Sequence, residues 1–469
     1  MAAKAWCMGV LAVTRIILLS MLSLPLFSAT YYLAPAADGG NDSNSGSSPN
    51  APWLSPNHSL KCGDTIIAAP SSSYNAADLT TDRWGNVSCA DHGVAWLTCR
   101  VFDACKLIST NGIHPDASHW GISGWEVQIN GGSGAGCFAA SPRGSTIEDI
   151  IFANDVANGC GGSGVTTYNN GNQGVDYIVV IGNIVWNATQ GNISCYSGIN
   201  ILQPVQSDTV AGTHIYVAGN FAFDNRNPSP CGGTQPTDGE GIIIDTLNGS
   251  GDGENYAQQV VVENNLAFLN GGRGISCCGD TSASIIIRRN TLFGNTRNVN
   301  GACGEILMGT TVNTIVTENL AETGPAGCSS NPNYVFYVQN ADATSTVFGN
   351  FGYSAEGNNI GISNSPHFSD GPNTFGTNPN FAATADPGAP NCAGFPNVPV
   401  CMAGLIANFT PQSPVATGYG YRPAGPDTPD ALFPQWLCNV DLPSGLVTMG
   451  CTARRNAKHA QPRPERPVD

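Results

Sequence analysis

Acidic side chains gather in one stretch in the middle of the chain. Residues 238–254 contain five carboxylates around the run EGIIID (240–245): Asp238, Glu240, Asp245, Asp252 and Glu254. Carboxylate oxygens are the ligands that calcium prefers, and paired carboxyl groups carry out acid–base chemistry at glycosidic bonds. This stretch is therefore the first candidate for a functional site, with Asp238, Asp245, Asp252 and Glu254 as expected calcium ligands.

Two reactions of carbohydrates could use this inventory. A lyase acting on a uronic acid needs a cation to neutralise the substrate carboxylate and a base to remove the neighbouring proton. A glycoside hydrolase needs two carboxyl groups, for which Glu240 with Asp245, or Asp238 with Glu240, are candidates. Three further residues belong to the predicted site: Arg273 beside Glu240 on the next repeat, and Asp280 and Arg226 as substrate contacts.

The elements that position these residues are repeats. A short apolar run that ends in asparagine occurs seven times, as DIIFAN (149–154), IVVIGN (178–183), IYVAGN (215–220), VVVENN (260–265), IIIRRN (285–290), TIVTEN (314–319) and STVFGN (345–350). The asparagines are 29, 37, 45, 25, 29 and 31 residues apart. Such periods indicate a solenoid, in which each coil buries its apolar face only by stacking on its neighbours. The acidic stretch lies in the longest interval, between Asn220 and Asn265, which directly follows the second longest. Insertions in a solenoid usually mark its binding face.

Within a repeat, the residue types predict which side chains point inward. Three positions before the asparagine every residue is apolar and β-branched: Ile151, Val180, Val217, Val262, Ile287, Val316 and Val347. Two positions before it the residues are mixed, so that this column is expected to face outward, with Glu263 and Arg288 as a surface ion pair. The asparagines themselves, and the second set Asn225, Asn270 and Asn295, are expected to stack as ladders at bends, where Asn tolerates a left-handed backbone.

A second strand family lies further along each coil. It reads SGINI (197–201), EGIIID (240–245), RGISCC (273–278) and GEILMG (304–309), with an expected inward column of Ile199, Ile242, Ile275 and Ile306. Strands at fixed positions in successive coils predict parallel, in-register sheets joined by right-handed crossovers.

The opening YYLAP followed by a Gly/Ser/Asn loop, with the V-x-x-N-N and G-x-G-I-x-I-D coils, resembles the secreted right-handed parallel β-helix proteins of the pectate-lyase-like superfamily. The coil pattern is most similar to polysaccharide lyase family nine. The resemblance implies an all-β right-handed parallel β-helix over residues 30–365 and makes Arg273 the candidate base or charge stabiliser. It departs from that family because no lysine lies between Lys106 and Lys458, and the motif blocks of the polygalacturonase-like families are absent.

Non-catalytic interpretations stay open at this point. Arg273 and Glu240 could form only a cross-coil salt bridge, and Asp/Gly runs such as NGSGDGENY (248–256) are common in solvated turns. His214, which directly precedes a strand, is expected to be a capping or surface histidine. The sequence thus predicts a pectate-like polysaccharide lyase, with a carboxylate-based hydrolase or epimerase and a non-catalytic glycan-binding protein as alternatives.

The remaining features concern export and the ends of the chain. Residues 1–29 have the pattern of a secretory signal, 366–452 are expected to form a C-terminal cap or wrapping segment, and 453–469 are a basic, Pro-rich tail. Sixteen cysteines follow Cys7, an even number that favours disulfides in an oxidising compartment. The net charge of −16 argues against nucleic acid as a partner. We expect a secreted or periplasmic monomer that acts on polysaccharide, with no membrane span after signal removal and with calcium as cofactor.

Overall fold

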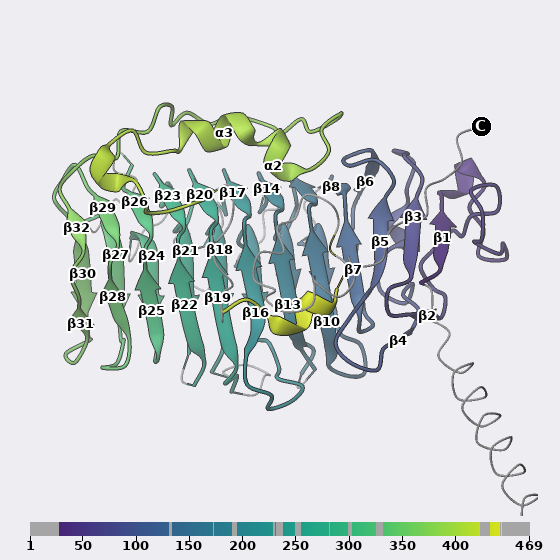
Figure 1. Ribbon diagram of the computed structural model, residues 1–469, viewed down its shortest axis with the longest axis horizontal. Helices are drawn as coiled ribbons and strands as arrows, with labels where there is room; N and C mark the ends of the chain where they lie inside the picture. The colour runs from purple at the N-terminus through teal and green to yellow at the C-terminus, as the bar shows by residue number, and fades with distance from the viewer. Residues whose placement is uncertain are drawn as a thin grey trace, which may run out of the picture.

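The chain winds into a solenoid of three parallel β-sheets, seen from the side in Figure 1. The structure, a computed structural model, describes residues 28–130, 134–171, 173–189, 195–227, 230, 238–248, 255–280, 282–298, 303–324, 332–422, 432–440 and 442. In each regular coil one strand enters each sheet in turn, as in β10 (Ile147–Ala153), β11 (Val156–Asn158) and β12 (Val165–Thr167). The predicted parallel β-helix is confirmed by this arrangement.

The first sheet has twelve strands. Besides β10 it contains β1 (Thr30–Leu33), β3 (Thr65–Ala68), β5 (Ala95–Cys99), β7 (Trp120–Ser123), β13 (Val175–Ile181), β16 (Thr213–Ala218), β19 (Gln259–Glu263), β22 (Ser284–Arg288), β25 (Thr314–Thr317), β28 (Thr346–Phe348) and β31 (Ser369–Asp370). Every neighbouring pair is parallel, as the repeats predict, and the pairing of β16 with β19 has one register shift, between Thr213 and Ile215.

The second sheet has ten strands and the third sheet eight. The second consists of β11 with β6 (Cys105–Ser109), β8 (Trp125–Ile129), β14 (Ile184–Trp186), β17 (Phe221–Phe223), β20 (Leu266–Phe268), β23 (Thr291–Phe293), β26 (Leu320–Glu322), β29 (Phe351–Tyr353) and β32 (Thr374–Phe375). The third consists of β12 with β9 (Phe138–Ala140), β15 (Ile199–Leu202), β18 (Ile242–Asp245), β21 (Ile275–Cys278), β24 (Gly304–Gly309), β27 (Tyr334–Gln339) and β30 (Ile360–Ser363). A small sheet pairs β2 (Leu60–Lys61) with β4 (Val87–Ser88). Strands β31 and β32 carry the solenoid beyond the expected end at 365.

The core is a stack of like residues from successive coils. The predicted column of Ile199, Ile242, Ile275 and Ile306 pairs in register along the third sheet, and each of its side chains is buried. In the first repeat, however, Phe152 and not Ile151 pairs with Val180, so the predicted alignment was one residue out there. Ile151 faces the outer side of the first sheet instead.

The asparagine ladders are confirmed, with one correction to their backbone. Asn220 Nδ2 donates to Asn265 Oδ1 (3.0 Å) and to the carbonyl of Val180 (2.9 Å), and the same pattern continues to Asn373. In the first repeat the ladder position belongs to Asp155, whose N–H donates to Asn183 Oδ1. The left-handed residue is the one before the ladder asparagine: Asn154, Gly182, Gly219, Asn264, Arg289, Glu318 and Gly349. The side-chain amide therefore serves the ladder, while its predecessor makes the bend.

Segments after the solenoid cover the outer faces of two sheets. Helices α2 (Val398–Cys401) and α3 (Ala403–Asn408) lie along the second sheet in Figure 1, where Met402 and Leu405 join the cluster of buried side chains that contains Phe223 and Phe268. The 3₁₀ helix η4 (Gln435–Asn439) packs against the first sheet through Leu437. The other 3₁₀ helices are η1 (Ala36–Asp38), η2 (Ala76–Asp78) and η3 (Pro414–Ala416).

The ion pair predicted between Glu263 and Arg288 is buried on the outer side of the first sheet. Arg288 Nε lies 2.6 Å from Glu263 Oε2, but only 10% and 2% of the two side chains are exposed. Tyr216 donates its hydroxyl to the other oxygen of Glu263. The pair is therefore a buried one, and the expectation of a surface ion pair was wrong because the outer column of the first sheet is not open to solvent throughout.

Disulfides are present, as the cysteine content predicted. They join Cys62 to Cys89, Cys99 to Cys105, Cys137 to Cys160 and Cys392 to Cys401, and Cys195, Cys303 and Cys438 are also disulfide-bonded. In the described part of the chain, Cys277 and Cys278 are free thiols. Across the same residues, no helix has both the length and the apolar character needed to cross a membrane.

Candidate functional site

The predicted catalytic residues meet just before the strands of the third sheet. Glu240 and Arg273 occupy equivalent places on adjacent coils, two residues before the paired Ile242 and Ile275. Arg273 Nη1 lies 2.9 Å from Glu240 Oε1, and Ser197 on the preceding coil donates its hydroxyl to Glu240 Oε2 at 2.7 Å. The structure thus brings Arg273 and Glu240 together. Because 1% of the Glu240 side chain and 10% of Arg273 are exposed, the pair is a buried one.

A row of glycines makes room for this arrangement. Gly198, Gly241 and Gly274 stand in register one residue further on, and a Cβ at Gly241 would lie 2.8 Å from Asn270 Nδ2 and 2.7 Å from the carbonyl of Gly274. The second asparagine ladder fills that space, with Asn225 Nδ2 donating to Asn270 Oδ1 at 2.9 Å. The G-I pattern of the repeats is therefore a packing requirement of the coil.

Asp245 is the half-buried carboxyl group of this region. It ends β18 between Leu202 and Cys278 of the neighbouring strands, and its Oδ1 accepts the hydroxyl of Thr246 at 3.0 Å. Burial, together with the negative charge of Glu240, raises the pKa of Asp245 above its usual range. A carboxyl group that keeps its proton closer to neutral pH can act as an acid or base in proton transfer.

The free thiols do not behave as nucleophiles here. Burial raises the pKa of Cys278 to about 12 and also raises the pKa of Cys277 strongly. The thiolate is the reactive form of cysteine, so both side chains stay inert at neutral pH.

The remaining predicted residues lie apart from one another. Asp280 is buried and accepts the backbone N–H groups of Ser282 and Ala283, which makes it a turn cap. Arg226 pairs with Asp224 at 2.6 Å near the end of β17, and 38% of its side chain is exposed. These contacts do not show whether Asp280 or Arg226 binds a substrate.

The expected calcium site is only partly described. Asp252 and Glu254 lie outside the described residues, which leaves Asp238 and Asp245 of the four expected ligands. No group of three or more His, Cys, Asp or Glu side chains placed to hold a metal ion occurs in the described ranges. The described side chains thus do not assemble a calcium site by themselves, and calcium stays a prediction.

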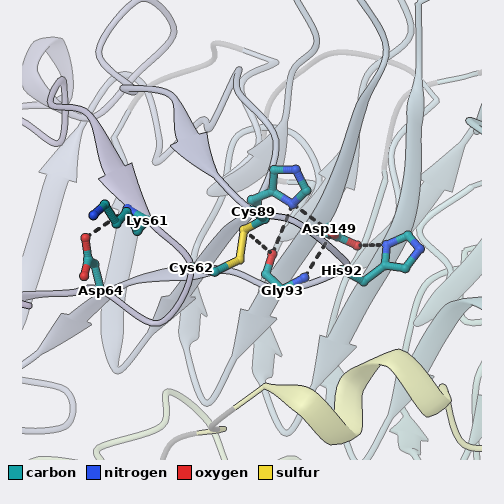
Figure 2. The surroundings of a disulfide bond; sticks show 8 residues. Lys61, Cys62, Asp64, Cys89, His92, Gly93 and Asp149 are labelled. Carbon is teal, nitrogen blue, oxygen red and sulfur yellow. Dashed lines mark hydrogen bonds and ion pairs between the residues drawn. A yellow bond between two sulfur atoms is a disulfide. The ribbon is translucent and has the colours of Figure 1, made fainter. Parts of the chain in front are cut away.

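A second cluster of titratable residues was not predicted. His92 Nδ1 lies 2.9 Å from Asp149 Oδ1 (Figure 2). His119 Nδ1 lies 2.8 Å from Asp149 Oδ2. The N–H of Gly93 donates to the same carboxylate at 3.2 Å, and the disulfide Cys62–Cys89 fixes the loop that carries His92 and Gly93. Asp149 is fully buried, whereas the two imidazoles reach the surface.

This cluster continues along the same edge of the first sheet. Tyr177 follows Asp149 on the next coil, its ring stacks on His214 at 3.8 Å, and its hydroxyl donates to Asp208. His214 is 1% exposed, with Nδ1 3.1 Å from Asp176 and Nε2 2.8 Å from the carbonyl of Val210. His214 is therefore a buried histidine, and the expected capping or surface role was wrong.

One sequence signal could have revealed the row. His119, Asp149, Tyr177 and His214 each directly precede the strand residue that pairs along the first sheet, namely Trp120, Ile150, Ile178 and Ile215. Alignment of the repeats on their asparagines does not bring these four residues into one column, because the first repeat is one residue out of register.

Comparison with known proteins gives similarity to solved structures. No family model matches the sequence, and no curated protein matches it. The GH136 lacto-N-biosidase from Eubacterium ramulus is 12% identical over 74% of this chain and 67% of that chain, with a TM-score of 0.38. The pectate lyase Pel9A is 16% identical over 76% and 84%, with a TM-score of 0.36. The A-module of the Azotobacter vinelandii mannuronan C-5 epimerase AlgE4 is 14% identical over 68% and 90%, with a TM-score of 0.31. Because these sequence identities and TM-scores are low, the chemistry of the site follows from its own side chains.

Proposed function

We propose that the protein cleaves a uronic-acid-containing, pectate-like polysaccharide by β-elimination at the third sheet, with Asp245 as the group that transfers a proton. The observation that carries this proposal is the position of Asp245, a half-buried carboxyl group at the end of a regular strand, whose pKa is raised by burial. A strand within a stacked sheet holds a reactive group more firmly than a loop does. Proton transfer is most efficient when the pKa of the side chain lies near the working pH.

Arg273 serves in this proposal as a stabilising charge. Its guanidinium is held in a 2.9 Å ion pair with the buried Glu240, so we assign it the role of a fixed charge and not that of a base. Arg273 and Glu240 together also lie within electrostatic range of Cys278, the residue that pairs with Asp245. In this proposal the guanidinium offsets the negative charge that develops when the proton next to a uronate carboxylate is removed.

Glycoside hydrolysis is the second candidate. A hydrolase needs one carboxyl group that keeps a proton and one that loses it. Asp245, whose pKa is raised by burial, and Glu240, which is ion-paired with Arg273, are the two carboxyl groups available for these roles. The burial of Glu240 places this candidate second, because its carboxylate has little access to a water molecule.

Export fits either reaction. Disulfides between described cysteines are typical of proteins that leave the reducing cytosol, and polysaccharides are met outside the cell. We therefore place the protein outside the cytoplasm, as a monomer that acts on a polymer.

The product distinguishes the two reactions. Purified protein is incubated with pectate, alginate and related uronans, with and without a calcium chelator, and both ultraviolet absorbance and new reducing ends are followed. β-Elimination gives an unsaturated sugar that absorbs ultraviolet light, whereas hydrolysis gives reducing ends without absorbance. Loss of absorbance on chelation would support a calcium requirement, with ligands other than Asp245, since that residue transfers the proton in this proposal.

A matched pair of variants tests the site. Asp245→Asn should lower the rate at least about a hundredfold, the usual size of a lost acid or base. Asp370→Asn, an exposed carboxylate on β31, should leave the rate unchanged. Full activity of Asp245→Asn would show that the reaction does not take place at the third sheet. Binding of polysaccharide without either product would reject both reactions.

A further inference from the structure

His92 and His119 are fixed by one buried carboxylate. Asp149 is fully buried and, as a carboxylate, only accepts hydrogen bonds. Each Nδ1 therefore carries the hydrogen in its contact with Asp149, and each ring directs Nε2 away from that carboxylate. In the described part of the chain, Nε2 of neither ring makes a hydrogen bond, and 29% and 17% of the two side chains are exposed.

The backbone places these side chains at one corner of the solenoid. His119 and Asp149 are left-handed, with φ of 69° and 57°, and Tyr177 on the following coil has φ of 47°. The three residues directly precede paired residues of β7, β10 and β13. Because the coils are held by continuous sheet hydrogen bonds, the corner presents a rigid set of side chains.

Aromatic rings surround His92. Its imidazole lies 4.0 Å from the ring of Tyr177 and 5.9 Å from that of Trp436, which comes from η4. Trp436 is half-buried, so this corner combines an exposed imidazole with part of an indole ring. Aromatic faces beside hydrogen-bond donors are usual in small, oriented binding sites.

The charges at the corner respond to pH. The hydrogen bond with Asp149 raises the pKa of His92, against the effect of burial. Burial is the largest effect on His119 and lowers its pKa, but the hydrogen bond with Asp149, the negative charges of Asp149 and Glu148 and the carbonyl of Gly93 together raise it. Glu148 and Asp208 add negative charge near His92 and Glu148 does so near His119, so that both rings are protonated at mildly acidic pH.

We propose that His92 and His119 form a second ligand site, at which their protonated Nε2 atoms bind carboxylates of an acidic sugar chain. The class of ligand rests on the proposed function, but the site is separate from the third-sheet site. It lies beside β5, β7 and β10, whereas Asp245 lies on β18, several coils further along. Asp149 is the positioning residue, and the two imidazoles are the groups that touch the ligand.

The protonation state of His92 and His119 determines the pH at which this site binds an acidic ligand. The two imidazoles face three carboxylates, those of Asp149, Glu148 and Asp208, so protonation of both rings takes the charge of this corner from −3 to −1. Binding of an anion therefore depends on direct hydrogen bonds from the two Nε2 atoms, and it should be modest and confined to low pH. We expect affinity for oligogalacturonate to fall at least about tenfold between pH of about 5.5 and about 8.5, across the range in which a histidine loses its proton.

Chemical modification of histidine tests the site without any need for catalysis. Diethyl pyrocarbonate acylates neutral imidazoles, and the modified residues are identified by mass spectrometry near pH of about 6.5, where part of each imidazole is neutral. Oligogalacturonate should slow the modification of His92 and His119 severalfold but not that of His367, an exposed internal control. A neutral oligosaccharide of equal length should protect neither. Equal modification with and without oligogalacturonate would overturn the proposal, as would equal protection by the neutral chain.

Variants separate this inference from the proposed function. His92→Gln with His119→Gln should abolish the pH-dependent binding seen by calorimetry, whereas His367→Gln should retain it. If uronan is cleaved in an Asp245-dependent manner but the histidines are not protected, the second site fails and the proposed function stands. If protection occurs and no uronan is cleaved, the site stands and the lyase reaction fails.

Discussion

Glu305 accepts the side-chain amide of Asn295 across 2.6 Å and so ends the second asparagine ladder. Its carboxylate also accepts the backbone N–H of Asn295, and the side chain is fully buried. In this ladder Asn225 donates to Asn270 and Asn270 to Asn295, each on the next coil, whereas Glu305 lies on the strand that follows Asn295 in the same coil. At the end of the row a glutamate therefore takes the place that another asparagine would fill.

This end of the ladder should make stability depend on pH. Burial raises the pKa of Glu305 to about 8, above the value of about 4.5 of an exposed glutamate. Because the folded chain then holds a proton that the unfolded chain has lost, this group stabilises the fold fully below pH of about 4.5, and that stability is lost as pH rises to about 8. Glu305→Gln keeps an oxygen that can accept from Asn295 and should reduce the loss.

The measurement is thermal unfolding at pH of about 5 and about 8. The Tm of Glu305→Gln should fall less than that of the wild type between these values. Glu356→Gln, an exposed control, should follow the wild type. An equal fall in all three proteins would show that Glu305 is ionised throughout.

The first ladder should be a main source of stability. Asn220→Ala removes the amide that donates to Asn265 and Val180, and it leaves the N–H of Asn183 without its acceptor. Buried groups that lose their partners cost about 1–3 kcal/mol each, so a loss of about 3 kcal/mol or more is expected in urea unfolding. Asn57→Ala, at an exposed position, should change the free energy of unfolding by less than about 0.5 kcal/mol. A similar small change for both variants would contradict a structural ladder.

The Glu240–Arg273 pair should have a structural role that is separable from catalysis. Arg273→Ala leaves the carboxylate of Glu240 buried without its cation, which costs about 3–5 kcal/mol. Adding Glu240→Gln removes the charge and should restore much of that stability, with the Ser197 hydrogen bond still available. Equilibrium unfolding of the single and double variants checks the coupling. Additive losses would mean that the two side chains do not depend on each other.

Asp149 should stabilise the fold most at low pH. The raised pKa values of His92 and His119 mean that their stabilising contribution is present below the unfolded value of about 6.5 and is lost as pH rises through the folded values. Asp149→Asn should therefore lower the Tm more at pH of about 5.5 than at about 8.5. Unfolding curves at both values provide the test, and a loss that is independent of pH would show that the imidazoles are neutral in the folded protein.

The glycine row should tolerate no side chain. Gly241→Ala would place a methyl group 2.7 Å from the carbonyl of Gly274 and 2.8 Å from Asn270 Nδ2, so a loss of about 1–3 kcal/mol is expected. Gly404→Ala in α3 meets nothing within 4 Å and should stabilise by about 0.4–1 kcal/mol. Opposite signs in urea unfolding are the expected result, and a neutral Gly241→Ala would show that the coil can widen there.

The repeats alone were enough to predict the fold. β-Branched residues at a fixed distance from an asparagine specify inward columns because every coil has the same neighbours above and below, and Ile242 pairs with Ile275 as the pattern requires. The same alignment placed Glu240 beside Arg273, which the structure confirms at 2.9 Å. A residue that occurs at the same place in successive repeats therefore lies beside its counterpart on the next coil.

Properties that depend on non-repeating contacts were decided by the tertiary structure. The first repeat shifted by one residue, so Phe152 and not Ile151 faces the core. The segment after residue 431 covers part of the first sheet, and no periodicity predicts where such a segment packs. Asp149 joins His92 to His119 from positions 57 and 30 residues away, a meeting that arises only when three coils close on one corner. Sequence thus determined the coil, because its contacts recur, and tertiary structure decided the sites, because their contacts occur once.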